Sequence, residues 1–193
     1  MAAEQGDVLA QYNLGLRHHQ GHGVSRDANK AVEWWTKAAE QGHAEAQHCL
    51  GIMCANGEGL PQSYAMAVEW YTKAAEQGHG ASQFNLGVMH NRGQGVSRNN
   101  TKALEWFAKS AEQGISDARL KIGVLHWKGE GTPVNCVKAY AWVLTANTVD
   151  KMVKFFLDIF KSEMTPEQIA EAQEMATEIL ERLSAKKVSN TSN

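Results

Sequence analysis

Polar side chains suited to binding another chain recur along this sequence at a constant spacing of 36 residues. Asn13 and Asn85 share one such column, and Asn56 and Arg92 share another. An asparagine side chain offers two hydrogen-bond donors and an acceptor, which suits the backbone of an extended peptide. The alternative is that these residues are only solvated positions on inner helices. We predict peptide-binding residues at Asn13, Arg17, Gln20, Asn56, Asn85, Arg92, Lys121 and Lys128.

A third column contains only side chains that can bind metal: His18, Cys54, His90 and His126. Adjacent helices lie about 8–10 Å apart, whereas zinc ligands lie about 2 Å from the ion. One ion therefore cannot join two repeats. We interpret the column as core or half-buried side chains, and we predict no metal site and no cofactor.

The elements that position these side chains are repeated. The motif Ala-Glu-Gln-Gly ends at Gly6, Gly42, Gly78 and Gly114. A fixed period of this length indicates a repeat architecture. Each repeat reads as a first helix, a Gly-x-Gly loop, a second helix and a short turn. We predict the first helices at about residues 8–20, 44–56, 80–92 and 116–128.

The second helices are predicted to begin at residues with good N-cap side chains, namely Asp27, Ser63, Asn99 and Asn135. Their apolar face is predicted to bury Trp34, Trp70, Trp106 and Trp142. Their solvent face carries Glu-to-Lys pairs such as Glu33 and Lys37. A glycine inside a helix costs about 1 kcal/mol relative to alanine. We therefore expect a neighbouring helix to cross at the glycine column, Gly15, Gly51, Gly87 and Gly123.

The motifs A-x-A-Q-x-x-L-G, G-x-G-V/L and K-A-V-E-W-W/Y-x-K-A-A-E-Q-G recur over about residues 1–149. They resemble the Sel1-like repeat family, a relative of the tetratricopeptide repeat. The resemblance implies an all-α, right-handed α/α solenoid of about four helix pairs whose first helices line a concave face. It also implies a scaffold or adaptor that binds a protein or peptide. In tetratricopeptide repeats, asparagines and basic residues in such columns hold a peptide backbone or its carboxylate.

The resemblance also supplies an alternative function, a hydrolase of the β-lactam type, because penicillin hydrolysis is attributed to the cysteine-rich branch of the family. Ser184 and Lys187 fit a Ser-x-x-Lys motif. The motif lies at a predicted helix end and has no partner motifs. We therefore predict no enzymatic activity. A third reading is a spacer whose groove binds nothing.

Composition narrows the class of partner. Hydrophobic residues make up 43% of 193 residues, and the net charge of −2 argues against nucleic acid or an anionic membrane as the main partner. No apolar run approaches the roughly 18 residues of a membrane span. The three cysteines are predicted to be free thiols.

Residues 2–6 match the end of a second helix, and the start of the chain lacks the apolar core of a signal peptide. We expect a fragment of a longer protein. It would be cytoplasmic as written, or periplasmic or secreted if a signal has been removed.

The repeat pattern breaks at 146–150. A helix at 151–162 follows, and a capping box with proline at its first helical position, starting at Thr165, opens another helix to about Ser184. These helices are predicted to cover the end of the stack. We predict repeats at 7–42, 43–78, 79–114 and 115–149 after a partial repeat at 1–6, capping helices at 150–186, and a disordered tail at 187–193.

Overall fold

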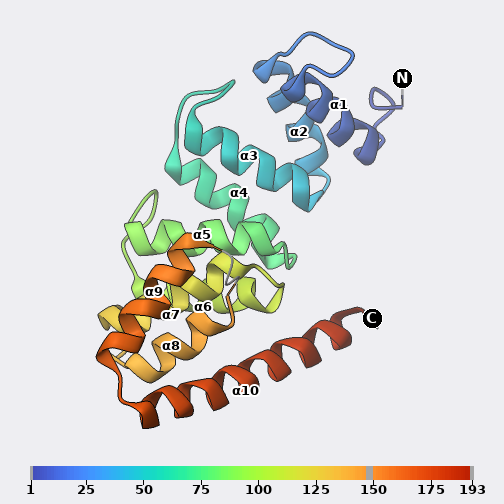
Figure 1. The fold of residues 1–193 in the computed structure, drawn as a ribbon. Helices are drawn as coiled ribbons and strands as arrows, with labels where there is room; N and C mark the ends of the chain where they lie inside the picture. The colour runs from blue at the N-terminus through green and yellow to red at the C-terminus, as the bar shows by residue number, and fades with distance from the viewer. Residues whose placement is uncertain (1, 147–149, 192–193) are drawn as a thin grey trace. The chain divides into compact units, whose positions relative to one another are not determined.

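The computed structural model describes residues 2–146 and 150–191, with side chains described up to residue 186. All regular secondary structure in these residues is α-helical (Figure 1). The helices are α1 (Val8–Gln20), α2 (Ala28–Glu40), α3 (Ala44–Asn56), α4 (Tyr64–Glu76), α5 (Gly80–Arg92), α6 (Asn100–Glu112), α7 (Ser116–Lys128), α8 (Cys136–Leu144), α9 (Lys151–Glu163) and α10 (Pro166–Thr191).

The chain divides into two compact units, residues 1–98 and 99–193. In the first unit α1 pairs with α2 and α3 pairs with α4, and each second helix also packs on the first helix of the next pair. In the second unit α6 packs on α7, α7 pairs with α8, and α8 carries both α9 and α10. Each unit is therefore built from helical hairpins that bury their apolar faces against the next helix.

Short polar side chains start the second helices, as the sequence predicts. The side-chain oxygens of Asp27, Ser63, Asn99 and Asn135 accept a hydrogen bond from the amide three residues later, at 2.7–3.3 Å. These bonds satisfy amides that have no partner within the helix. The first helices end at glycines in the left-handed region, for example Gly57 with φ of 71°.

The glycine column confirms that a neighbouring helix crosses the first helix. A Cβ added to Gly15 would lie 2.6 Å from the Trp35 ring. At Gly51 the corresponding contact would be made by the ring of Tyr71, and at Gly123 it would be made by Val143. The missing side chain therefore lets the two helices of a hairpin approach, which offsets the cost of a glycine within a helix.

The prediction that the tryptophan column forms the core was wrong, because the buried column lies one position further along each second helix. Trp34, Trp70, Trp106 and Trp142 are only half-buried. The buried column is the next one, with exposures of 0–3% at Trp35, Tyr71, Phe107 and Val143. Trp35, Tyr71 and Val143 face the glycines of their own hairpins, Gly15, Gly51 and Gly123, so the close approach of the two helices decides which column is buried.

The predicted Glu-to-Lys pairs on the second helices do not form in the described residues. Instead, each lysine lies over the tryptophan three positions before it. The ammonium groups of Lys37, Lys73 and Lys109 are 4.1–4.2 Å from the ring centroids of Trp34, Trp70 and Trp106. A cation over an indole ring is worth about 0.5–1 kcal/mol at an exposed site, which exceeds the usual value of an exposed helical ion pair.

The end of the second unit is covered by α10. Its buried face carries Ala172, Ala176, Ile179 and Leu183, which join the core around α8. The predicted capping box forms, since Thr165 and Gln168 exchange hydrogen bonds between side chain and backbone amide at 3.0 and 3.3 Å. The helix continues past the predicted end near Ser184 to Thr191, so the backbone of 187–191 is helical where a disordered tail was expected.

Some predictions concern residues that the structure does not describe. The break in the repeat pattern falls largely on 147–149, and the last two positions of the predicted tail are 192 and 193. Both segments lie outside the described residues.

Candidate peptide-binding surface

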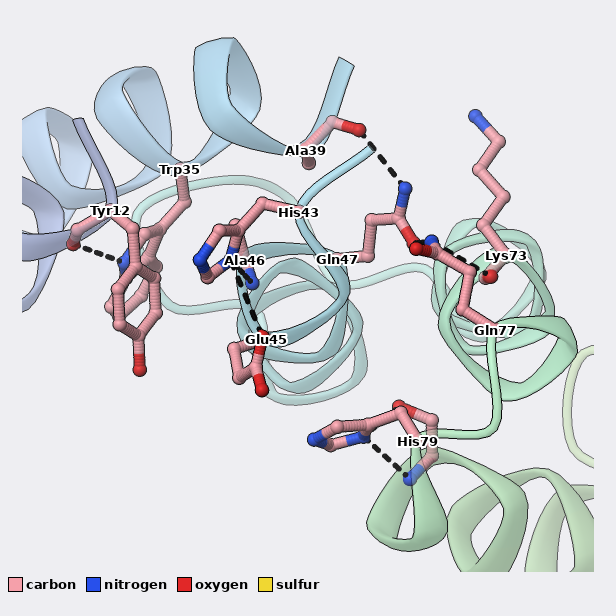
Figure 2. Close-up of polar contacts among 11 residues, drawn as sticks. Tyr12, Trp35, Ala39, His43, Glu45, Ala46, Gln47, Lys73, Gln77 and His79 are labelled. Atoms are coloured by element: carbon pink, nitrogen blue, oxygen red, sulfur yellow. Dashed lines mark hydrogen bonds and ion pairs between the residues drawn. The ribbon is translucent and has the colours of Figure 1, made fainter. Parts of the chain in front are cut away.

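Buried glutamines hold the first helices in register with the preceding hairpin. The side-chain amide of Gln47 on α3 donates to the carbonyl oxygen of Ala39 at 3.0 Å, and its oxygen accepts from Gln77 at 2.7 Å (Figure 2). Gln11 repeats the arrangement with Ala3 and Gln41 at 3.1 and 2.8 Å. Because the Gln11 and Gln47 side chains are buried and hydrogen-bonded at both ends, they fix which faces of α1 and α3 point outward.

Histidines cap two of the first helices in this unit. The Nδ1 atoms of His43 and His79 accept hydrogen bonds from the amides of Ala46 and Ser82 at 3.2 Å (Figure 2). The buried Ser82 hydroxyl lies 2.9 Å from Nδ1 of both His79 and His48. Burial, together with the neighbouring His79, lowers the pKa of His48 to about 4, and burial lowers the pKa of His79. Both imidazoles are therefore neutral at pH 7.

Three of the predicted binding residues meet in one pocket of about 220 Å³. Asn56 lies at the end of α3, and Asn85 and Arg92 lie two turns apart on α5. The pocket, which we call the α3–α5 pocket, is also lined by Ala55, Tyr64, Tyr71, Val88, Met89 and Gln94. It therefore combines apolar and tyrosine side chains with amide groups and one guanidinium group.

Tyr71 connects this pocket to the core. Its ring packs on Gly51, and its side chain lines the pocket together with Asn85. Burial raises the pKa of Tyr71 to about 12, and the nearby Asn85 amide opposes this rise. The phenol is therefore neutral at pH 7. Arg92 is exposed, and no ion pair within the described part of the chain engages its guanidinium group.

The predicted residues of α1 line a different pocket, of about 540 Å³, which contains Asn13, Arg17 and Gln20. Asn13 and Gln20 are exposed. Arg17 belongs to another column, because its equivalents Met53 and Met89 are only 1% and 6% exposed. Arg17 itself is exposed and lines the same pocket as Asn13 and Gln20, so it is accessible on α1 although its column is buried in the next two repeats. Lys121 and Lys128 are both exposed on α7, in the second unit.

The groups considered for metal or hydrolytic chemistry are dispersed. Cys54 is 1% exposed, and the three histidines of its column are half-buried. Across residues 2–146 and 150–186, no group of three or more His, Cys, Asp or Glu side chains could hold a metal ion. The cysteines of this region are free thiols. Ser184 is exposed on α10, and the side chain of Lys187 lies outside the described residues.

Two tyrosines of the α3–α5 pocket were not identified from the sequence. Tyr71 lies in the column of Trp35 and Phe107, which reads as a second apolar position beside the tryptophans. The sequence signal that could have identified Tyr71 is the glycine column, because a glycine within a helix indicates a bulky side chain packed against it from the partner helix. Tyr64 is the first residue of α4 and is 36% exposed, and its position gives no periodic signal.

The Sel1 repeat profile matches four successive segments, residues 8–43, 44–79, 80–115 and 116–146. No curated protein matches the chain at a significant level. Among the described residues, no helix combines the length and the apolar character needed to cross a membrane.

Solved structures with the same fold include two with 30% identity or more. A protective antigen of uropathogenic Escherichia coli strains that displays an SLR fold is 33% identical, with a TM-score of 0.86. The match covers 98% of this chain, which spans only 41% of that chain. A Sel1 repeat protein from Oxalobacter formigenes is 30% identical with a TM-score of 0.79, and the match covers 88% of this chain and 74% of that one.

The cysteine-rich protein B of Helicobacter pylori is more distant. It is 21% identical with a TM-score of 0.50, and the match covers 61% of this chain and 92% of that one. This likeness concerns the fold alone. Together with the two nearer structures, it confirms the predicted all-α fold of repeated helical hairpins, the Sel1-like solenoid.

Proposed function

The chain belongs to the Sel1-repeat family, whose members are generally protein-interaction scaffolds, and from this premise we infer that it is a non-catalytic scaffold or adaptor. We propose that it binds an extended segment of a partner protein on the outward face of its first helices. Asn13 and Gln20 on α1, Asn56 on α3, and Asn85 and Arg92 on α5 form this face in the first unit. In the second unit, Lys121 and Lys128 are the exposed residues of α7 at the repeat positions of Asn85 and Arg92.

The observation that carries the proposal is the convergence of Asn56, Asn85 and Arg92 in the α3–α5 pocket. An asparagine amide can donate to a peptide carbonyl and accept from a peptide amide, so it pairs with a backbone of any sequence. An arginine without an ion-pair partner supplies a charge-assisted bond to a carboxylate. These groups together suit an extended, acidic or C-terminal peptide segment.

The rigidity of the surface supports the same function. Gln47, which ties α3 to the preceding hairpin, is buried, and Tyr71, which lines the α3–α5 pocket beside Asn85, is held in the core with 3% exposure. A receptor surface that is formed before binding loses little conformational entropy when the ligand arrives. Affinity can then come from a few polar contacts.

The test uses random twelve-residue peptides displayed on phage, selected on the full chain and then measured by calorimetry. We expect Asn85→Ala with Arg92→Gln to weaken a selected peptide by about tenfold to a hundredfold, the cost of losing one or two charged or polar contacts. The control is Glu33→Gln, an exposed change on α2. Equal affinities for all three proteins would contradict the proposed surface.

A further inference from the structure

The second unit contains a pocket of about 410 Å³ that shares no residue with the proposed binding face. It is formed by α7, α8 and α10, and we call it the Trp142 pocket. Its lining residues are His126, Lys138, Trp142, Met175, Glu178, Ile179 and Arg182.

The pocket exists because the fourth repeat departs from the pattern of the first three. In those repeats the lysine three residues after the tryptophan covers the indole ring at 4.1–4.2 Å. Thr145 stands at that position after Trp142, is 6% exposed, and donates its hydroxyl to the Trp142 carbonyl at 2.7 Å. A short, internally bonded side chain cannot reach over the ring, so the indole of Trp142 remains available to line the pocket.

The opposite wall is an apolar and firmly held segment of α10. Ile179 is 7% exposed and Met175 is half-buried, and both face the pocket. The same helix is anchored by Ala172, Ala176 and Leu183 in the core around α8. One turn beyond Arg182, Lys186 forms an ion pair with Glu112 of α6. The two walls are therefore pre-formed.

The charged groups of the pocket add up to one positive charge. Lys138 and Arg182 contribute cations and Glu178 contributes an anion, and in the described residues of this unit none of the three is engaged in an ion pair. Burial and the nearby Lys138 lower the pKa of His126, so the imidazole is neutral at pH 7. The pocket therefore attracts an anionic group, and Trp142, Met175 and Ile179 offer an apolar surface beside the charges.

We propose that the Trp142 pocket binds the C-terminal residue of a partner protein whose last side chain is apolar or aromatic. The terminal carboxylate would bind Lys138 and Arg182, and the side chain would pack on Trp142, Met175 and Ile179. A volume of about 410 Å³ lies at the small end of the range of ligand pockets, so one or two residues fill it. A chain terminus is the part of a protein that presents a carboxylate and an apolar side chain on a single residue.

The site differs from the outward face of the first helices in all of its residues, so it can be tested separately. The probe is a fluorescein-labelled peptide, Gly-Ser-Gly-Ser-Phe, with a free carboxyl end, titrated with the full chain and followed by fluorescence polarisation. Two control probes are used: the same peptide with a C-terminal amide, and a C-terminally amidated peptide in which Lys replaces the final Phe. The indole NH resonance of Trp142, assigned by its loss in Trp142→Phe, reports the location of binding.

We expect saturable binding of the acid peptide with a shift of the Trp142 resonance. The amide should bind about tenfold more weakly, and so should the acid peptide with Arg182→Gln, as for the loss of one charge-assisted bond. Lys161→Gln, which removes an exposed charge on α9, should leave the affinity unchanged.

Three results would overturn the proposal: equal binding of acid and amide, tighter binding of the Lys-ended amide, or no saturation by the acid peptide at millimolar concentration. Unchanged affinity in both Arg182→Gln and Lys138→Gln would overturn it as well. Asn85→Ala with Arg92→Gln serves to separate the two sites, because it should weaken the phage-selected peptides and leave the Phe-ended peptide unaffected.

Discussion

The ring of Tyr71 lies so close to Gly51 that a Cβ on the glycine would be within 2.4 Å of it. This contact joins the two helices of a hairpin and places the Tyr71 side chain in the α3–α5 pocket beside Asn85. One residue of the core therefore also lines the proposed binding surface.

Gly51→Ala should therefore destabilise the protein although alanine favours the helix. We expect the free energy of unfolding to fall by about 1–3 kcal/mol, the usual cost of overpacking, as measured by urea denaturation. The double variant Gly51→Ala with Tyr71→Leu should lose less than the sum of the two single changes, because the leucine makes room for the methyl group. Strict additivity would show that the two side chains do not compete for space.

Adjacent aromatic residues of α4 should differ in their contribution to stability. Tyr71 is 3% exposed and Trp70 is half-buried with Lys73 over its ring. Tyr71→Ala should cost about 3–5 kcal/mol, as for a buried aromatic residue, and Trp70→Ala about half as much. Calorimetric or urea unfolding of the two variants measures the difference. A larger loss of stability in Trp70→Ala than in Tyr71→Ala would show that the tryptophan column, and not the Tyr71 column, forms the core.

The stability of the first unit should depend on pH through His48. Its pKa is about 4 in the folded chain against an ordinary value of 6.5, so the unfolded chain binds the proton at higher pH than the folded one. The stabilisation is complete above pH 6.5 and is lost as the pH falls toward 4. We expect a loss of about 2 kcal/mol over that range, allowing for the partial exposure of the ring.

Urea unfolding at several pH values measures this dependence. His48→Gln serves as the control, since it cannot titrate and should show a flatter dependence between pH 4 and 6.5. An identical slope in both proteins would assign the pH dependence to other groups.

Most of the fold could be predicted from the 36-residue period of the sequence. The period predicted the observed bounds of the first helices and the residues that cap the second helices. Both depend on capping residues and glycines, which act on the neighbouring backbone and recur in every repeat. The period could not choose between Trp34 and Trp35, because both lie within the wide apolar arc of one helix. The contact of Trp35 with Gly15 of the neighbouring helix makes that choice, and the periodicity of one helix alone does not show it.

The candidate site was predictable only in part for a related reason. Asn56, Asn85 and Arg92 share a pocket because columns at one spacing lie on one face of stacked helices. Arg17 belongs to the same predicted set and is exposed beside Asn13 and Gln20, but its repeat equivalents Met53 and Met89 are buried, so this column does not continue along the later repeats. Trp142 looked like another core residue because the effect of Thr145 appears only when α10 forms the other wall of the pocket.

Residue-level mapping of a bound peptide tests the central claim most directly. A phage-selected peptide is titrated into the isotopically labelled chain, and the shifts of side-chain NH resonances are followed by NMR. The account predicts the largest shifts at the amides of Asn56 and Asn85 and at the guanidinium of Arg92. Shifts confined to the Trp34 and Trp70 indoles of the second helices, with Asn85 unmoved, would contradict it.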